Sequence, residues 1–148
     1  MIGKIKYAPG TIASLITCLL FLLLINIFNI EIIFLITLII FIYSFHAINN
    51  SFNEFKSEDP QEIVIDEFVG QMLTLLAIPI YETLYPLPII YYCVAAFLLF
   101  RLFDIWKPYP ISYIDDNTSG PLGIMLDDII ASIYSILILI LIFFFFGG

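Results

Sequence analysis

Charged side chains gather at the ends of apolar segments in this sequence, and their types fit phosphate chemistry. Charged residues in membrane-like segments are costly to place, rare and usually functional. They form one mixed group and two acidic pairs: Arg101, Asp104 and Lys107; Asp66 and Glu67; Asp127 and Asp128. We predict that these three groups meet at one water-facing edge of a small helical bundle.

The acidic residues predict a magnesium site. One carboxylate in the first turn of a helix can simply cap backbone N–H groups. Two doubled pairs at the same depth as Asp104 leave surplus carboxylates, which repel one another unless a proton or a cation bridges them. Mg²⁺ takes a few carboxylate oxygens and completes its shell with water and substrate phosphate. We therefore expect some subset of Asp66, Glu67, Asp127 and Asp128 to bind Mg²⁺.

The basic residues have two readings. Arg101 and Lys107 could extend to the membrane interface, with Arg101 paired to Asp104 at i, i+3. Beside a metal site, a planar Arg and a mobile Lys also become candidates to hold a phosphate. Residues Ala8–Thr11 lead into a helix N-terminus, where free N–H groups can bind an anion. Thr11 joins Arg101 and Lys107 as a candidate phosphate-binding residue, although Pro-Gly is also a common helix start.

The composition determines which elements must position these residues. With 148 residues the chain is expected to form a single domain over residues 1–148. Hydrophobic residues make up 62% and aromatic residues 17% of the chain, far above the usual soluble mixture. The net charge of −8, with no basic stripe, argues against a nucleic-acid partner. We predict an all-α, polytopic membrane helical bundle that contacts membrane lipids.

Five apolar segments are expected to form its helices. Their approximate ranges are Gly10–Ile30, Glu31–Ile48, Ile63–Ile80, Ile89–Ile105 and Gly123–Phe146. Pro108 and Pro110 are expected to stop the fourth helix. The stretch 109–121 is expected to be a polar loop, in which Asp115, Asp116 and Asn117 look like turn residues.

The positions of the basic residues predict the orientation of the bundle. With five crossings, all Lys and Arg residues fall on one side: Lys4, Lys6, Lys56, Arg101 and Lys107. By the positive-inside tendency this side, with the N-terminus, is the cytoplasm. The same assignment puts every dense acidic group there. A bacterial-type cytoplasmic membrane is the expected location.

Helical spacing predicts that the key acids point into the protein. Small or weakly polar residues mark helix contacts in membranes. The residues sharing a face with Asp66 are Gly70, Thr74 and Ala77; with Asp128, Ala131, Ser132 and Ser135; with Asp104, Phe100, Ala96 and Cys93. Glu67 shares its face with Gln71 and Thr74. Cys18 and Cys93 lie in apolar runs, so packing roles are expected rather than a disulfide or zinc.

Four motifs carry a resemblance to a known family. They are Ala8–Thr11; Asp59 and Pro60 followed by Ile63–Glu67; Phe100–Ile111; and Gly123–Asp128. Together they resemble the phosphatidylglycerophosphatase A family. The resemblance implies Mg²⁺-dependent removal of the terminal phosphate of phosphatidylglycerophosphate, giving phosphatidylglycerol at the cytoplasmic membrane. It also implies a helical bundle with a central helix surrounded by others.

The resemblance assigns the polar positions of the family residue by residue. They fall on Asp59, Asp66, Glu67, Arg101, Asp104, Lys107, Asp127 and Asp128. We expect Asp66, Glu67, Asp104 and Asp128 to be catalytic, with Asp59 as a possible accessory residue. Asp104 or Asp66 would orient the attacking water in metal-assisted hydrolysis. A covalent aspartyl-phosphate remains open as a variant.

A membrane cation or proton transporter component is the alternative function, because acids in membrane helices also line ion paths. Such a path needs polar groups near the bilayer centre and on the far side. In this chain the far halves of the segments consist mainly of Leu, Ile and Phe.

Overall fold

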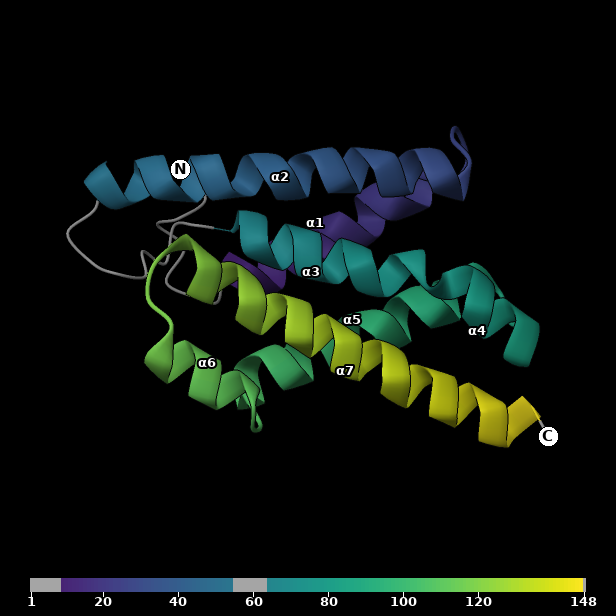
Figure 1. The fold of residues 1–148 in the computed structure, drawn as a ribbon. Coiled ribbons are helices and arrows are strands. Elements are labelled where there is room, and N and C mark those ends of the chain that lie inside the picture. Colours follow the sequence, from purple (N-terminus) through teal and green to yellow (C-terminus); the bar gives the residue numbers. More distant parts are fainter. Residues whose placement is uncertain (1–8, 55–63, 148) are drawn as a thin grey trace.

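The computed structural model describes residues 9–54 and 64–147, which form helices and no strand (Figure 1). In order these are α1 (Pro9–Leu24), α2 (Ile30–Glu54), α3 (Ile65–Leu76), α4 (Ile78–Leu84), α5 (Ile89–Trp106), α6 (Ile111–Asn117) and α7 (Pro121–Gly147). The predicted all-α class is confirmed.

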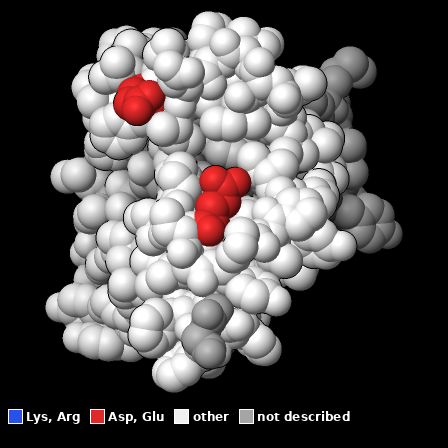
Figure 2. All heavy atoms as spheres, turned by 90° about the vertical axis from the view of Figure 1, so that its right-hand side faces the viewer, with Lys and Arg blue, Asp and Glu red and all other residues white. Residues whose placement is uncertain are grey.

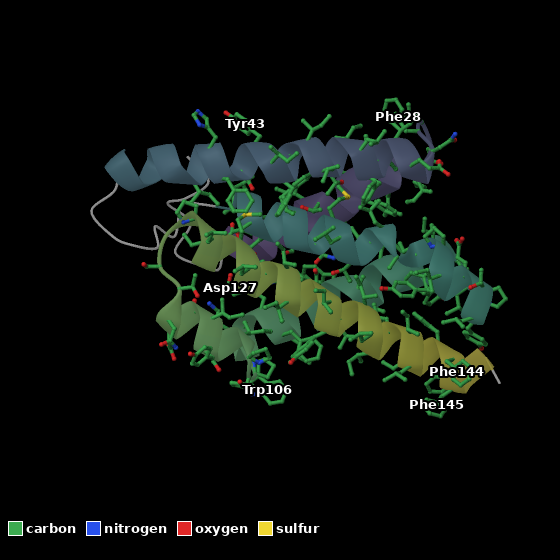
Figure 3. All side chains as sticks on the ribbon, viewed as in Figure 1. Phe28, Tyr43, Trp106, Asp127, Phe144 and Phe145 are labelled. Carbon is green, nitrogen blue, oxygen red and sulfur yellow. The ribbon has the colours of Figure 1, made fainter. Side chains whose placement is uncertain are left out.

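Within the part of the chain that the structure describes, three helices are long and apolar enough to cross a membrane: Ile30–Ile48 in α2, Ile89–Trp106 in α5 and Pro121–Phe146 in α7. Helix α1 is apolar but shorter, with 16 residues. Large apolar side chains point away from the bundle, as Phe28, Phe144 and Phe145 do in Figure 3. Because lipid tails replace a protein core around such surfaces, the fold is a helical membrane bundle.

Helix α3 lies at the centre of the bundle and contacts α1, α2, α4, α5 and α7. A small residue permits α3 to approach two of these helices closely. A β-carbon at Gly70 would lie 2.7 Å from a ring carbon of Phe100 on α5 and 3.1 Å from the backbone oxygen of Asp128 on α7. Gly70 therefore brings three helices together, and the central helix implied by the family resemblance is present.

The third predicted helix is broken, which corrects the expectation of one continuous segment over Ile63–Ile80. Helix α3 ends at Leu76, and α4 begins at Ile78 with Pro79 in its first turn. Proline has no N–H to donate and its ring clashes with the carbonyl four residues earlier, so one helix cannot continue through Pro79. A bend at Ala77 joins the two pieces.

The predicted polar loop 109–121 is also wrong in part, because it contains α6. Asp115, Asp116 and Asn117 lie in this short helix rather than in turns. The predicted end of the fourth helix is confirmed: Lys107 is its C-cap in the left-handed conformation (φ 45°), and Pro108 follows. Pro110, by contrast, precedes the first turn of α6. Helix α2 runs on to Glu54, past the predicted end near Ile48.

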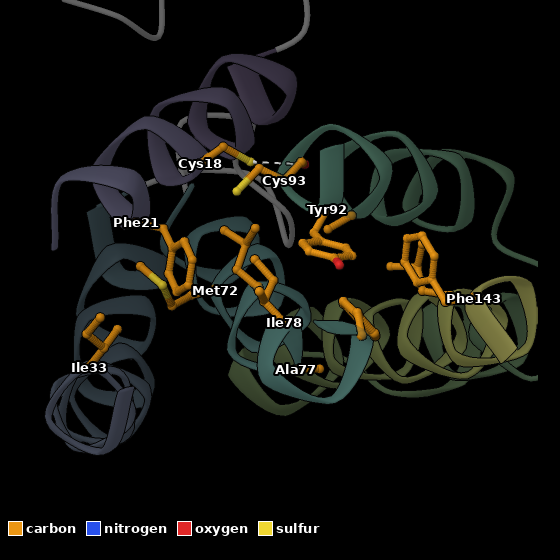
Figure 4. Packing of buried hydrophobic residues seen from close by; sticks show 13 residues of the cluster. Cys18, Phe21, Ile33, Met72, Ala77, Ile78, Tyr92, Cys93 and Phe143 are labelled. Carbon is orange, nitrogen blue, oxygen red and sulfur yellow. Dashed lines mark hydrogen bonds between the residues drawn. The ribbon is translucent and has the colours of Figure 1, made fainter. Parts of the chain in front are cut away.

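The core of the far half of the bundle is sealed by aromatic rings. Tyr81 of α4, Tyr92 of α5 and Phe143 of α7 pack together with centroids 5.2 to 6.2 Å apart. Figure 4 shows this packing beside Cys18 and Cys93, which are buried free thiols as predicted. The Cys18 thiol contacts the backbone oxygen of Cys93 at 4.0 Å.

Candidate active site

The three charged groups predicted from the sequence meet at one end of the bundle. The first turn of α3, the last turns of α5 and the first turns of α7 lie on the same side of the molecule (Figure 1). Figure 2 shows the opposite end, where two acidic patches and no Lys or Arg are visible. The directions in which these helices run therefore bring together side chains that lie up to about sixty residues apart in the sequence. We call five of them the carboxylate cluster: Asp66, Glu67, Asp104, Asp127 and Asp128.

Asp104 lies at the centre of the carboxylate cluster. Its carboxyl group contacts that of Asp128 and lies within electrostatic range of Glu67 and Asp127. Arg101 Nη1 lies 2.5 Å from Asp104 Oδ2, the ion pair predicted at i, i+3. Arg101 and Lys107 are the two described cations at this end, and they face five carboxyl groups, so acidic groups are in excess.

The predicted inward direction of the acids is confirmed. The residues that share their faces are buried: Gly70, Thr74 and Ala77 on α3; Phe100, Ala96 and Cys93 on α5; Ala131, Ser132 and Ser135 on α7. Asp128 is only 2% exposed. The carboxylates therefore point into the protein and not into acyl chains.

Lys107 joins α5, α6 and α7. Its ammonium lies 2.8 Å from Asp127 Oδ2 and 2.7 Å from Asp115 Oδ1. Burial alone would lower the pKa of Lys107, but its two acidic partners outweigh burial and raise that pKa above its usual range. Lys107 is therefore charged. Asp115 was missed as a partner because a turn was expected at its position.

The N-terminus of α1 approaches the same cluster. A β-carbon at Gly10 would overlap Glu67 Oε1 and lie 3.1 Å from Arg101 Nη1. Thr11 follows in the first turn of α1 and is half-buried. The first N–H groups of a helix have no partner within it and favour anions. The structure thus places the Ala8–Thr11 motif, of which Pro9–Thr11 is described, beside Arg101.

Several polar atoms at this end are buried without a hydrogen-bond partner. Among the described residues they include Asp66 Oδ1, Glu67 Oε2, Asp128 Oδ2 and Arg101 Nε. Gln71 lies one turn below Glu67, is fully buried, and leaves both of its amide atoms unpaired. From its spacing in the sequence, Gln71 indicated only a helix face. Buried polar atoms normally have partners, so these atoms indicate a place for ligand, ion or water.

The chemistry of these donors fits Mg²⁺. Uncompensated carboxylate oxygens are hard ligands that favour a divalent cation. Within residues 9–54 and 64–147, no three His, Cys, Asp or Glu side chains form a ready metal-binding group. Mg²⁺ commonly binds one or two carboxylates and takes its other ligands from water and phosphate, so a complete protein cage is not required. Asp59 lies outside the described residues.

Comparison with known proteins places the chain in a family. Residues 1–143 match the family model PgpA, described as phosphatidylglycerophosphatase A. The chain belongs to the phosphatidylglycerophosphatase A family. The match covers all the cluster residues and both basic residues. The resemblance carried by the four motifs is thereby confirmed.

Individual relatives agree with this assignment. A phosphatidylglycerophosphatase A of Haemophilus influenzae is 35% identical over 136 residues, which cover 92% of this chain and 79% of the relative. The Escherichia coli phosphatidylglycerophosphatase A is 32% identical over 133 residues, 90% of this chain and 73% of the relative. A Bacteroides thetaiotaomicron protein provisionally named a phosphatidylinositol-3-phosphatase is 31% identical over 140 residues, 93% and 84% of the two chains. No solved structure matches the chain significantly.

Proposed function

We propose that this member of the phosphatidylglycerophosphatase A family removes the terminal phosphate of phosphatidylglycerophosphate by Mg²⁺-dependent hydrolysis at the cytoplasmic face of the membrane. Membership of the family supports the phosphatase activity. The observation that carries the proposal is the meeting of Asp104, Asp128 and Arg101 at one end of a membrane bundle. A lipid held there keeps its acyl chains in the bilayer while its head group reaches water.

The phosphate would lie between α1 and α5. Arg101 Nε is a buried donor without a partner. The N-terminal N–H groups of α1 lie near it, because Gly10 in the first turn of α1 is close to the Arg101 guanidinium. Both features stabilise phosphate oxygens by hydrogen bonds and positive charge. Lys107 supplies a second cation. When substrate binds, its ammonium would leave Asp127 or Asp115 and pair with the phosphate.

Asp66, Glu67, Asp127 and Asp128 would hold the magnesium ion. When bound, Mg²⁺ would neutralise phosphate oxygens and favour attack at phosphorus. Asp104 contacts Asp128 and pairs with Arg101, so its carboxylate is placed to orient a water between the acids and the phosphate. Uncatalysed phosphomonoester hydrolysis is among the slowest known reactions, so these charges must supply much of the rate. Asp66 is the alternative residue for orienting that water.

The cytoplasmic assignment rests on charge. Both described basic residues, Arg101 and Lys107, lie at the carboxylate end, and the opposite end in Figure 2 shows none. Positive charges favour the cytoplasmic side of bacterial membranes. To test the assignment, Asp116→Cys or Glu82→Cys would be introduced into a Cys18→Ser, Cys93→Ser background. Intact cells would then be treated with a membrane-impermeant thiol reagent. We expect labelling only at Glu82, and labelling only at Asp116 would reverse the orientation.

The Bacteroides relative favours a second candidate substrate, phosphatidylinositol 3-phosphate. Both lipids carry a phosphomonoester on a diacylglycerol-based head group, so Arg101 and the carboxylate cluster would serve either. A transporter is less well supported, because the rings of Tyr81, Tyr92 and Phe143 close the far half of the core. A phosphatase family match also gives no support to transport.

One assay separates these functions. Purified protein in detergent would be given phosphatidylglycerophosphate, phosphatidylinositol 3-phosphate and a soluble phosphomonoester, each with Mg²⁺ and with EDTA. We expect Mg²⁺-dependent phosphate release, fastest from phosphatidylglycerophosphate. Preference for the inositol lipid would reassign the substrate, and absence of release from all three would reject the phosphatase proposal. Rapid acid quench with labelled substrate would distinguish direct attack by water from a trapped aspartyl-phosphate.

A further inference from the structure

Two buried polar side chains lie deeper in the bundle than the carboxylate cluster, at the contact of α1 with α3. Ser14 of α1 and Gln71 of α3 are both 0% exposed. Ser14 Oγ and both amide atoms of Gln71 have no hydrogen-bond partner. We call Ser14 and Gln71 the inner polar pair. Because unpaired polar atoms in a protein interior are costly, a role other than packing is indicated.

Ser14 differs from the other buried serines and threonines of residues 9–54 and 64–147. Each of the others donates its hydroxyl to a backbone oxygen of its own helix, three or four residues earlier. They are Thr17, Thr37, Ser44, Thr74, Ser132 and Ser135. This local bond satisfies a hydroxyl inside a helix. Ser14 does not make it, so its hydroxyl is available to a partner outside α1.

The register of α1 against α3 places the inner polar pair at one level. Gly10 and Glu67 are neighbours, because a β-carbon at Gly10 would overlap the Glu67 carboxyl group. From this contact both helices run in the same direction, away from the charged end of the molecule (Figure 1). Ser14 and Gln71 each follow four residues later, on the same helix faces and ~6 Å deeper. The pair therefore lies one turn below Glu67.

The unpaired atoms of the inner polar pair complement an unpaired atom of Glu67. Glu67 Oε2 is also buried without a partner. A carboxylate oxygen accepts hydrogen bonds, whereas a hydroxyl and an amide each offer both a donor and an acceptor. None of these atoms is hydrogen-bonded to another. A buried water makes about three hydrogen bonds to polar groups that lack other partners, and these three side chains offer that number.

We propose that Ser14 and Gln71, together with one bound water, hydrogen-bond to Glu67 Oε2 and orient the Glu67 carboxylate for Mg²⁺. The inference rests on the proposed function for the presence of the metal ion. Groups behind a metal ligand fix its orientation, and their loss typically lowers metal affinity 10–100-fold. Ser14 and Gln71 are thus positioning residues that act through Glu67.

Thermal unfolding of EDTA-treated protein in detergent, with increasing Mg²⁺, tests the proposal without turnover. The variants are Ser14→Ala and Gln71→Leu, and Ser135→Ala is the matched control. Ser135 is also 0% exposed, but its hydroxyl is paired within α7 with the backbone oxygen of Ala131 at 2.8 Å. The control therefore removes the same atom from a buried serine outside the inner polar pair.

We expect both variants of the inner polar pair to need about tenfold more Mg²⁺ than wild type for the same rise in unfolding temperature. Ser135→Ala should need the wild-type concentration. An unchanged Mg²⁺ requirement in either Ser14→Ala or Gln71→Leu would overturn the inference. Absence of any stabilisation of the wild-type protein by Mg²⁺ would overturn it together with the proposed metal site.

A double variant tests whether the two residues act as one unit. Substitutions within one hydrogen-bonded network are not additive, whereas independent effects multiply. We expect the Ser14→Ala, Gln71→Leu protein to need about tenfold more Mg²⁺, as each single variant does. A requirement raised about a hundredfold would show two separate effects and would overturn the shared network.

Phosphate release from the three substrates named above separates this inference from the proposed function. A raised Mg²⁺ requirement in Ser14→Ala and Gln71→Leu, with no phosphate release by the wild-type protein, would retain the inner polar pair and reject the phosphatase proposal. Normal release by the wild-type protein, with an unchanged Mg²⁺ requirement in both variants, would retain the function and reject the inference.

Discussion

The ammonium of Lys107 lies 2.8 Å from the carboxylate of Asp127 and so joins the end of α5 to the start of α7. Asp127 is 7% exposed, and its other oxygen accepts the backbone N–H of Asp128 at 3.0 Å. The same ion pair therefore fixes the position of Asp127 and of the neighbouring residue that contacts Asp104.

Removing this cation should weaken the fold. Lys107→Met leaves Asp127 buried beside other acids, so we expect a loss of about 1–3 kcal/mol in the free energy of unfolding. The pKa of Lys107 is raised, so its stabilising contribution is complete below the unfolded pKa near 10.4 and disappears only as pH rises further. Thermal unfolding of both proteins in detergent near pH 9, where the carboxylates are ionised and Lys107 is still charged, should show this difference. Equal unfolding temperatures there would contradict the paired state of Lys107.

Asp128→Asn should abolish phosphate release without unfolding the protein. The amide has the shape of the carboxylate but removes the charge facing Asp104 and the proposed metal site, so we expect a loss of at least about 100-fold in kcat. Asp116→Asn, on the exposed face of α6, is the matched control and should keep full activity. Size-exclusion chromatography in detergent checks folding. Near-normal turnover by Asp128→Asn would remove Asp128 from the site.

Magnesium should be detectable without turnover. Added Mg²⁺ should raise the unfolding temperature of EDTA-treated protein, because a ligand that binds only the folded state stabilises it by mass action. The shift should be lost in an Asp127→Asn, Asp128→Asn double variant, and Ca²⁺ serves as the comparison ion. An equal shift in the double variant would place the metal elsewhere. In the same samples, EDTA should stop phosphate release and Mg²⁺ restore it.

Two glycines should respond differently to alanine. A β-carbon at Gly10 meets the flexible end of Glu67, which can move at little cost, so Gly10→Ala should lower activity about tenfold with little change in stability. At Gly70 the β-carbon meets the ring of Phe100 and the backbone of Asp128, so Gly70→Ala should destabilise the protein by about 1–3 kcal/mol. Activity and unfolding midpoints measured together test the contrast. Equal destabilisation by both variants would contradict the expectation that Glu67 moves away at little cost.

Gln71→Leu should separate function from stability. Both amide atoms of Gln71 are buried and unpaired, so replacing them with apolar atoms should keep or raise the unfolding temperature. The amide lies one turn below Glu67, and its loss should lower kcat about tenfold if measured at saturating Mg²⁺. Leu76→Met, on the same helix, is the control. A less stable but fully active Gln71→Leu protein would show that Gln71 is structural.

The inward-facing acids were predictable because helical periodicity is local information. Small residues at the right spacing from Asp66, Asp104 and Asp128 identified the buried faces, and the structure confirms all three. The positive residues likewise indicated which helix ends would meet. These predictions needed no knowledge of how the helices pack, only that apolar segments must cross a membrane.

Features that depend on tertiary contacts were not predictable in the same way. Asp115, Asp116 and Asn117 favour turns by local preference, but the pair between Asp115 and Lys107 helps to hold them in α6. The contact of Gly10 with Glu67 joins residues on two helices and leaves no local pattern. Pro79 is a local signal for the helix break, but the prediction treated Ile63–Ile80 as one apolar segment.

The packed rings of Tyr81, Tyr92 and Phe143 close the core of the bundle at the end away from Asp104. A lipid in the distant leaflet has no route past these rings to Asp104. The protein should therefore hydrolyse substrate in only one leaflet. In vesicles that carry substrate in a single leaflet, protein inserted in one direction should release phosphate, and protein inserted in the opposite direction should release none.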